Sequence, residues 1–181
     1  MDDIAREAGI SKKTLYQHIK DKKSLVTNVM ENFLEEDEAC VLKIVEQADD
    51  AITQMFKINQ AGLDIMKNIK PTLIYDLQKY YRETWDLVNR HHMEFFLKII
   101  QTNLQVGITN GTYREDLDVN IISRLFVKTM LILVDEALFP NNQYTKSALL
   151  KEHLLYHMNG IINPSHSNRI QEISIQLHQT Q

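Results

Sequence analysis

The sequence predicts an all-α fold, and three observations support that prediction. The 181 residues include only five Gly and three Pro. Long stretches rich in Leu, Ile, Lys and Glu lie between those residues, and many of their apolar positions recur at helical spacing. The scarcity of Gly and Pro disfavours sandwiches, barrels and nucleotide-binding folds with Gly-rich loops, and no strand, repeat or low-complexity tract stands out.

The first twenty residues predict two short helices joined by a tight turn. Asp2 or Asp3 can cap the first helix, and Gly9 can end it in a left-handed conformation. Ser11 stands where an N-cap is needed for a second helix over residues 12–19. This order of helix, turn and helix is that of a helix-turn-helix motif.

Six further helices are predicted along the rest of the chain. They span residues 21–46, 49–69, 72–79, 82–106, 119–138 and 145–159. Pro71 separates the second of these helices from the third, because proline disfavours helical geometry at the residue before it. Gly107 and the Asn110-Gly111 turn indicate a loop after the fourth.

The predicted helix over residues 119–138 is apolar on nearly every side. Asp118 caps it and Pro140 follows it. A helix of this kind near the end of a chain needs a partner surface. Beyond the last strong helix, which Thr145 caps, residues 165–181 carry only a weak stripe of Ile170, Ile173 and Leu177.

The composition limits the class of protein. The chain is 44% apolar and 24% charged, which is ordinary for a soluble globular protein. Its single cysteine, Cys40, excludes an internal disulfide framework and a Cys-based zinc finger. No uncharged apolar run approaches the length of a membrane span, and the first residues do not look like a signal peptide. We therefore expect a reduced, cytoplasmic protein with no membrane partner.

The charge is distributed unevenly. The formal net charge is −4, but residues 1–30 carry six Lys and Arg against four Asp and Glu. Residues 12–23 contain five lysines and one aspartate. A basic end on an acidic body indicates a polyanionic partner for that end, although a solvated Lys-rich turn gives the same pattern.

Residues 9–25 carry a more specific pattern, GISKKTLYQHIKDKKSL. Ala5 and Leu15 lie where the two short helices approach each other. The outward side chains suit a DNA duplex, with cations for phosphates and hydroxyl, amide and ring groups for base edges. These outward residues are Lys12, Lys13, Thr14, Tyr16, Gln17 and His18.

This stretch resembles the DNA-binding signature of the TetR family of bacterial transcriptional regulators. The resemblance implies that Thr14, Tyr16 and His18 lie on the recognition helix and that Lys22 contacts a phosphate. It also implies a homodimer, formed through the helices over about 119–138 and 145–159, that binds a palindromic double-stranded operator and responds to a small-molecule effector.

The family plan divides the chain into two domains. Residues 1–30 are expected to form the helix-turn-helix DNA-binding domain, and residues 31–181 the helical effector-binding and dimerisation domain. The DNA-binding domain of the family has three helices, and this sequence begins at the second. We therefore expect the first helix to be absent from this chain and the domain to be incomplete at its N-terminus.

Six of the aromatic residues fall within residues 75–96, where the family encloses its effector. An apolar, aromatic pocket with a few polar groups is the usual design of a small-ligand site, although aromatic residues at helical spacing also form ordinary cores. Nothing in this set implies a charge on the ligand. The candidate ligand-binding residues are Phe56, Asn59, Tyr75, Tyr81, Trp85, His92, Phe95 and Phe96.

We therefore expect a ligand-responsive repressor released by a small apolar or aromatic effector, not an enzyme. Two alternatives remain: a helical enzyme that uses His92 or Asp86 as acid or base, and an interaction module whose basic end binds an acidic protein. His92 also fits a hydrogen-bonded core position. His153 and His157 are four residues apart, but no third ligand is visible, so neither a metal nor a cofactor is expected.

Overall fold

The computed structural model describes residues 1–179, apart from the side chains of residues 71, 174 and 176–179. Within that part of the chain the fold is all-α, as predicted, with one isolated β-bridge between Tyr113 and Ile162. The helices are α1 Asp2–Glu7, α2 Lys12–His18, α3 Lys22–Gln47, α4 Ala51–Asn68, α5 Pro71–Tyr80, α6 Arg82–His91, α7 Leu97–Thr109, α8 Val119–Ile132, α9 Lys146–Ile161 and α10 Asn168–Gln179.

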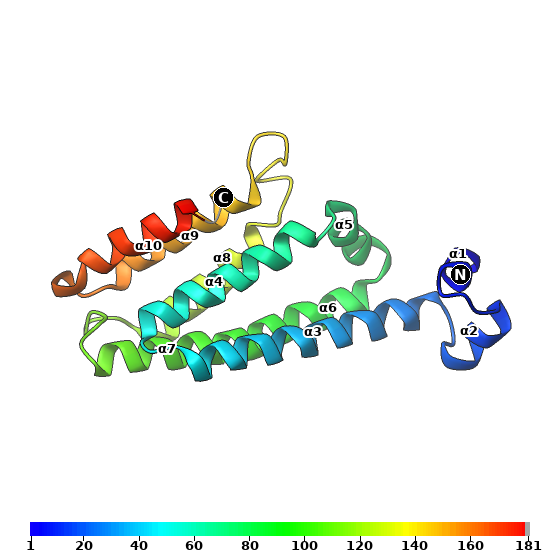
Figure 1. Cartoon of the computed structure of the whole chain (residues 1–181), viewed down its shortest axis with the longest axis horizontal. Helices are drawn as coiled ribbons and strands as arrows, with labels where there is room; N and C mark the ends of the chain where they lie inside the picture. The colour runs from blue at the N-terminus through cyan, green and yellow to red at the C-terminus, as the bar shows by residue number, and fades with distance from the viewer. Residues whose placement is uncertain (180–181) are drawn as a thin grey trace.

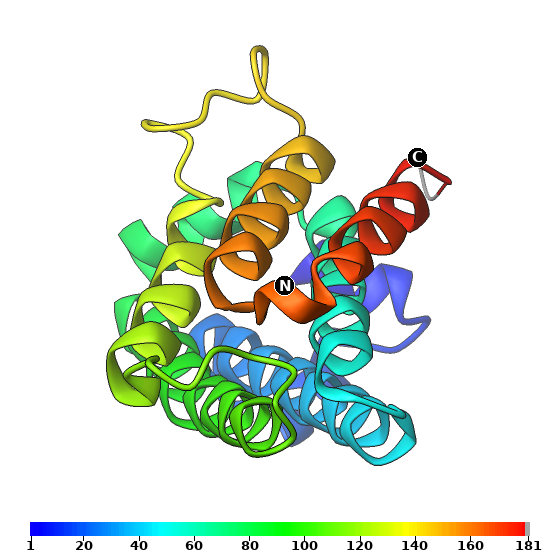
Figure 2. The same ribbon diagram turned by 90° about the vertical axis from the view of Figure 1, so that its left-hand side faces the viewer.

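The helices form a small head and a larger body (Figure 1). The head consists of α1 and α2, which pack on each other beyond one end of the remaining helices. Helix α3 runs from this head along the body, so the domain boundary expected at residue 30 falls inside one continuous helix. In the body, α4 packs against α3, α7 and α9, and α7 packs against α8. Figure 2 shows α9 and α10 on the side of the body opposite α3 and α7.

Side-chain caps fix the helix starts that the sequence predicts. The side chains of Ser11, Asp118 and Thr145 each accept a hydrogen bond from the backbone N–H three residues later, at 3.0, 3.0 and 3.2 Å. These bonds satisfy donors that have no partner inside the helix. The three predicted caps are therefore confirmed.

The cap predicted at Asp2 or Asp3 is wrong. Helix α1 follows Met1 and has no side-chain cap, and both aspartates lie in its first turn. Their carboxylates pair with cations instead. Asp2 Oδ1 lies 2.9 Å from Lys12 Nζ, and Asp3 Oδ1 lies 2.8 Å from Arg6 Nη2.

Helix α8 is shorter than the predicted range of 119–138. It ends at Ile132, and the next residues form turns that the Asp135 carboxylate stabilises by accepting a hydrogen bond from Ala137 N at 2.9 Å. Phe139 packs against a second cluster of apolar side chains that includes Leu150 of α9. This tertiary contact draws the chain away from the helix axis, which local propensity does not reveal. The second predicted helix of the pair, α9, is present.

The long helix predicted over residues 82–106 contains an interruption. A π-helical segment, His92–Phe96, joins α6 to α7, and α7 continues to Thr109. Gly107 therefore lies inside a helix and not in the predicted loop. A Cβ at this position would lie only 2.1 Å from Cδ2 of Tyr113, so glycine is needed for close packing of the tyrosine ring.

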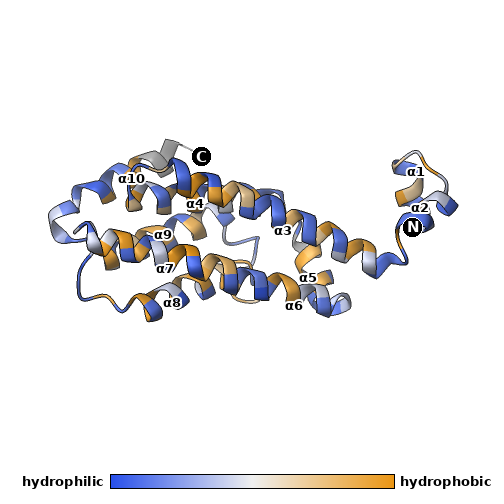
Figure 3. Ribbon diagram, turned by 90° about the horizontal axis from the view of Figure 1, so that it is seen from below, coloured by the Kyte–Doolittle hydropathy of each residue, from blue (hydrophilic) through white to orange (hydrophobic). Residues whose placement is uncertain are grey.

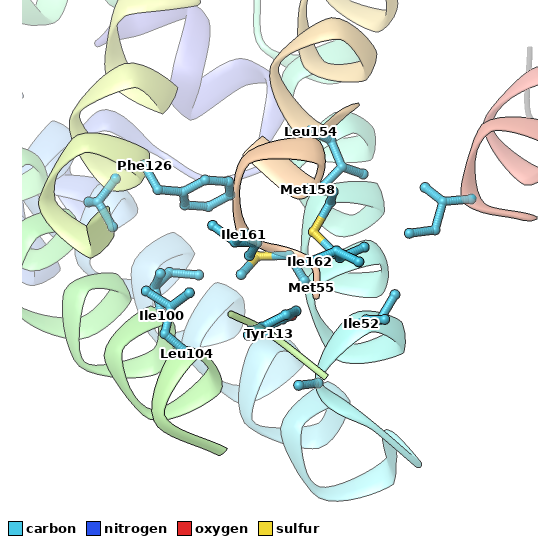
Figure 4. Close-up of a cluster of buried hydrophobic side chains, with 13 residues drawn as sticks. Ile52, Met55, Ile100, Leu104, Tyr113, Phe126, Leu154, Met158, Ile161 and Ile162 are labelled. Atoms are coloured by element: carbon cyan, nitrogen blue, oxygen red, sulfur yellow. The ribbon is translucent and has the colours of Figure 1, made fainter. Parts of the chain in front are cut away.

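The main core lies between α4, α7, α8 and α9, whose apolar side chains converge in Figure 4. Tyr113, from the loop after α7, is 1% exposed within it. Its hydroxyl donates to Asn103 Oδ1 at 3.0 Å. The amide nitrogen of Asn103 donates to the carbonyl oxygen of Ala51 at 2.8 Å and to Gln54 Oε1 at 2.7 Å. The amide oxygen and the amide nitrogen of Asn103 therefore both have hydrogen-bond partners.

The C-terminal helix α10 is held more firmly than its weak apolar stripe predicts. Ile173 is 3% exposed in the main core, whereas the side chain of Leu177 and residues 180–181 lie outside the described part. Arg169 Nη2 lies 3.0 Å from Asp50 Oδ2, which joins α10 to the start of α4. Burial disfavours ionisation of Asp50, but hydrogen bonds from Thr53 and Arg169 outweigh it and lower the pKa of the carboxyl.

Apolar and hydrophilic residues alternate along α3, α4 and α7, as expected for helices with one side against a core (Figure 3). In the described residues, no helix combines the length and apolar character needed to cross a membrane.

Candidate nucleic-acid interface and ligand cavity

The outward side of α2 is exposed and polar. Leu15 and Ala5 are only 6% and 4% exposed and hold α2 against α1, as the sequence predicts. Gly9, in the turn between the helices, adopts a φ of 66°, as predicted. The remaining side of α2 faces solvent at Lys12, Lys13, Tyr16, Gln17 and His18, and Thr14 is half-buried.

Two of these side chains already have partners within the head. Lys12 Nζ pairs with Asp2, and this hydrogen bond and the opposite charge raise the pKa of Lys12. Thr14 Oγ1 lies 2.8 Å from Ser11 Oγ. A phosphate at Lys12 would therefore have to displace Asp2, whereas Thr14 is oriented by the same serine that caps α2.

Lys22 opens α3 directly after the motif and is exposed. Asp21 and Ser24 form a capping box around this start, in which the Asp21 carboxylate accepts from Ser24 N at 2.7 Å. The same hydrogen bond lowers the pKa of Asp21. The cap fixes where the first turn of α3, and with it Lys22, stands relative to α2.

Two contacts join the head end of α3 to α6. Lys23 Nζ lies 2.9 Å from Glu83 Oε2, and Thr27 Oγ1 lies 2.7 Å from Thr84 Oγ1. Thr84 is 1% exposed, so the hydroxyl pair lies within the body. The two threonines are 57 positions apart, and no sequence signal relates them.

A cavity of about 160 Å³ lies inside the body, between α3, α4, α6, the π-helical segment and α8. Four of the eight candidate ligand-binding residues line it, namely Asn59, Trp85, His92 and Phe96. The other walls are almost entirely apolar and include Phe33 of α3. Phe33 is not recognisable as a wall residue from the sequence, because its apolar spacing along the helix is equally typical of ordinary packing.

The other four candidates lie outside the walls of this cavity. Phe56 packs against the main core, Tyr81 is half-buried where α5 meets α6, and Tyr75 is 54% exposed. Phe95 stacks on His91 at a centroid distance of 5.6 Å. Phe96, four residues after His92, lies with it in the cavity wall, whereas Phe95 does not, as expected for the wider turn of the π-helical segment.

Besides the indole of Trp85, three polar side chains line the cavity. Burial lowers the pKa of His92 to about 4, so its ring is neutral near pH 7, and it packs on Phe96 at 4.6 Å. Burial raises the pKa of Asp37. Asn59 is 2% exposed, and its amide nitrogen has no hydrogen-bond partner among the described residues.

A wider hollow of about 460 Å³ lies next to the cavity, between α5, α6 and the loop after α8. Its lining includes Tyr75, Lys128 and Asp135. Ile74, Leu131 and Val134 line both spaces, so these three side chains form the partition between the outer hollow and the inner cavity.

Helices α8 and α9 also expose apolar side chains. Ile121, Leu125 and Ile132 of α8 are 56%, 59% and 44% exposed. Their spacing of four and seven residues puts them on one side of the helix. Tyr156 of α9 is 85% exposed.

The polar residues considered for catalysis or metal binding do not form a cluster. His153 and His157 both pack on Phe126, at centroid distances of 4.8 and 4.4 Å. Within the described residues, no three His, Cys, Asp or Glu side chains are placed to hold a metal ion. Asp86 is exposed and is not part of the cavity wall that contains His92.

Residues 1–29 match a family model described as bacterial regulatory proteins, tetR family. The chain is also 23% identical over 180 residues to the HTH-type transcriptional repressor KstR2 of Rhodococcus jostii (strain RHA1), a match that covers 90% of this chain and 80% of that protein. A KstR2 repressor of Mycolicibacterium smegmatis (strain ATCC 700084 / mc(2)155) is 26% identical over 139 residues, which is 73% of this chain and 66% of the relative.

A solved structure has the same fold. The structure of the ketosteroid transcriptional regulator KstR2 of Mycobacterium tuberculosis superposes with a TM-score of 0.67 at 22% sequence identity. The match covers 90% of this chain and 84% of that chain.

Proposed function

This chain belongs to the TetR family of bacterial transcriptional regulators, and we propose that it acts as a repressor that binds a palindromic operator as a homodimer. A small apolar or aromatic effector would release it from the DNA. Because the family consists of regulators, the chain is not an enzyme.

The proposed DNA contacts come from α2 and the start of α3. Lys12, Lys13 and Lys22 contact phosphates, which fix the position of the head on the duplex. Thr14, Tyr16, Gln17 and His18 lie near base edges in the major groove. The observation that carries this proposal is the exposed polar side of α2, on a head that stands beyond the body.

The proposed dimer forms through α8 and α9. The exposed apolar side chains Ile121, Leu125 and Ile132, with Tyr156, support this surface, because apolar groups exposed together favour burial against a partner. In such a dimer the two α2 helices enter successive major grooves, about 34–36 Å apart or a multiple of that distance.

We assign residues 1–30 to DNA binding and residues 31–181 to effector binding and dimerisation. The contacts Lys23–Glu83 and Thr27–Thr84 support a route between these functions, because they join α3 to the helix that continues into the cavity wall. An effector acts by this route only if it binds the DNA-incompetent arrangement more tightly than the competent one.

The test compares two substitutions in the full-length protein, with operator fragments selected from genomic DNA by the protein itself. Lys22→Ala is expected to weaken binding to all sequences alike and to reduce the slope of log affinity against log salt by about one. Gln17→Ala is expected to relax base preference, with a loss of about 1–3 kcal/mol for the preferred operator alone. Gel shifts over a salt series measure both effects.

Lys57→Ala is the matched control, because Lys57 is an exposed lysine on α4 in the body. It should leave operator affinity unchanged. Equal and sequence-independent losses from Lys22→Ala and Gln17→Ala would contradict the division between phosphate and base contacts. Loss of DNA binding on Lys57→Ala would contradict the assignment of DNA binding to the head.

A further inference from the structure

We propose that the cavity takes an uncharged, compact and largely apolar compound with one carbonyl oxygen, and that this oxygen accepts a hydrogen bond from the amide nitrogen of Asn59. The inference deepens the proposed function, since it names the chemical class of the effector. The cavity and the unpartnered amide that support it do not depend on DNA binding.

Two buried asparagines of the body show why Asn59 is unusual. Asn103 is 1% exposed, and its side chain makes hydrogen bonds to Tyr113, Ala51 and Gln54. Asn59 is 2% exposed, but its amide nitrogen has no partner in residues 1–179. A buried donor without a partner is unfavourable, and such a group in a native protein requires an explanation. A ligand that brings an acceptor into the cavity supplies one.

The remaining walls select against charge on the ligand. Apart from Asn59, the indole of Trp85 and the neutral ring of His92, the only polar group among the lining side chains is the carboxyl of Asp37. No Lys or Arg lines the cavity, and Lys128 lines only the outer hollow, so a carboxylate ligand would lose its hydration without an opposite charge in the wall. An ammonium ligand would suit Asp37, but it has no acceptor for Asn59.

The dimensions favour a ligand of one or two rings. The cavity of about 160 Å³ is smaller than the roughly 300–1,000 Å³ of sites for larger ligands. Aromatic walls at Trp85, Phe96 and Phe126 are suited to a flat hydrocarbon frame.

The test uses four probes that share one frame: 1-tetralone, tetralin, 1-aminotetralin and tetralin-1-carboxylate. Calorimetric titration of the 181-residue chain without DNA measures each affinity. We expect 1-tetralone to bind about tenfold more tightly than tetralin, which is the size of one neutral hydrogen bond. Both charged probes should bind more weakly than 1-tetralone.

Asn59→Leu removes the donor and keeps a similar volume, so it should abolish the tenfold preference for 1-tetralone over tetralin. Asn59→Ala repeats the test if the leucine variant does not fold. Asn68→Leu is the matched control, because Asn68 lies on the same helix, is exposed and donates to Asp64 O at 2.8 Å. The control should keep the preference for 1-tetralone.

Three results would overturn the inference: equal affinities for 1-tetralone and tetralin, a preference that survives both Asn59 variants, or tightest binding of either charged probe. Operator release by 1-tetralone is measured separately, by gel shift with the full-length protein. If 1-tetralone binds in a way that depends on Asn59 but does not release the operator, the ligand class is supported and the proposed effector response is contradicted. Intact operator binding without any preference for the ketone contradicts the ligand class alone.

Discussion

In the head, the functional side chains are neighbours in sequence and point to solvent, whereas in the body the cavity is assembled from helices far apart in the chain. Residues 12–18 of α2 carry nearly all of the proposed DNA contacts within two turns. The cavity takes Phe33 from α3, Asn59 from α4, Trp85 from α6 and Phe126 from α8. The comparison teaches that a local surface can be recognised from a motif, while an enclosed space depends on packing.

Three changes test this comparison, and the first has the largest expected effect. Gly107→Ala places a methyl group 2.1 Å from Cδ2 of Tyr113, whose ring is enclosed in the main core and tied to Asn103. We expect the free energy of unfolding of the body to fall by about 3 kcal/mol, as for severe overpacking. Urea denaturation followed by circular dichroism measures the loss.

Gly160→Ala is the matched control for that change. Gly160 lies in α9, and no atom lies within 4 Å of a Cβ added there. Because alanine favours helix over glycine, this variant should gain roughly 0.5–1 kcal/mol in free energy of unfolding. Equal effects of the two substitutions would contradict tight packing around Tyr113.

Acid is expected to have a smaller effect at each buried histidine of the body, and these include His92 as well as His153 and His157. Burial lowers the pKa of His153 to about 4 and that of His157 to about 3. In the unfolded chain these histidines bind protons near pH 6.5, whereas in the folded protein they remain neutral to a lower pH. Their contribution to the free energy of unfolding is therefore fully present above pH 6.5 and is lost as the pH falls towards 4. At pH 5 we expect a loss of about 2 kcal/mol per histidine relative to pH 7.

Urea denaturation at a series of pH values checks the acid effect. His157→Phe should reduce the loss between pH 7 and pH 5 by about 2 kcal/mol, because the ring stays uncharged beside Phe126 while the other buried histidines still titrate. His18→Ala, in the head, should leave the loss as it is in the unsubstituted protein. An unchanged acid loss in His157→Phe would show that another group is responsible.

The smallest effect is expected at the link between head and body. Lys23 and Glu83 are 51% and 81% exposed at their side chains, and solvent screens such a pair. A double-mutant cycle with Lys23→Met and Glu83→Gln should give a coupling energy of about 0.5 kcal/mol that falls as salt is added. A coupling energy between Lys23 and Glu83 that does not change with salt would contradict an exposed, screened ion pair.

Thr84→Val leaves the Thr27 hydroxyl without its partner. It should lower the free energy of unfolding by about 1 kcal/mol at every salt concentration.

Much of the fold follows from local patterns. The caps at Ser11, Asp118 and Thr145 and the left-handed Gly9 are where the sequence predicts them. The predictions failed where distant residues decide the outcome. Gly107 resembles a helix end in sequence, but in the structure it makes room for Tyr113.

The candidate sites divide in the same way. Each residue on the outward side of α2 could be predicted from the sequence, because helical periodicity fixes which side chains share a face. For the cavity, Asn59, Trp85, His92 and Phe96 lie in the wall, but Phe95 does not. The π-helical segment changes the register within one turn, and no sequence pattern marked it.

By itself, the sequence determined an all-α chain, the helix-turn-helix at its start and the side chains that this motif presents to solvent, because these depend on spacing and capping over a few residues. Only the tertiary structure decided where α8 ends, which side chains enclose the cavity and which buried amide lacks a partner. Those outcomes depend on contacts between residues tens of positions apart, whose energies local periodicity does not encode.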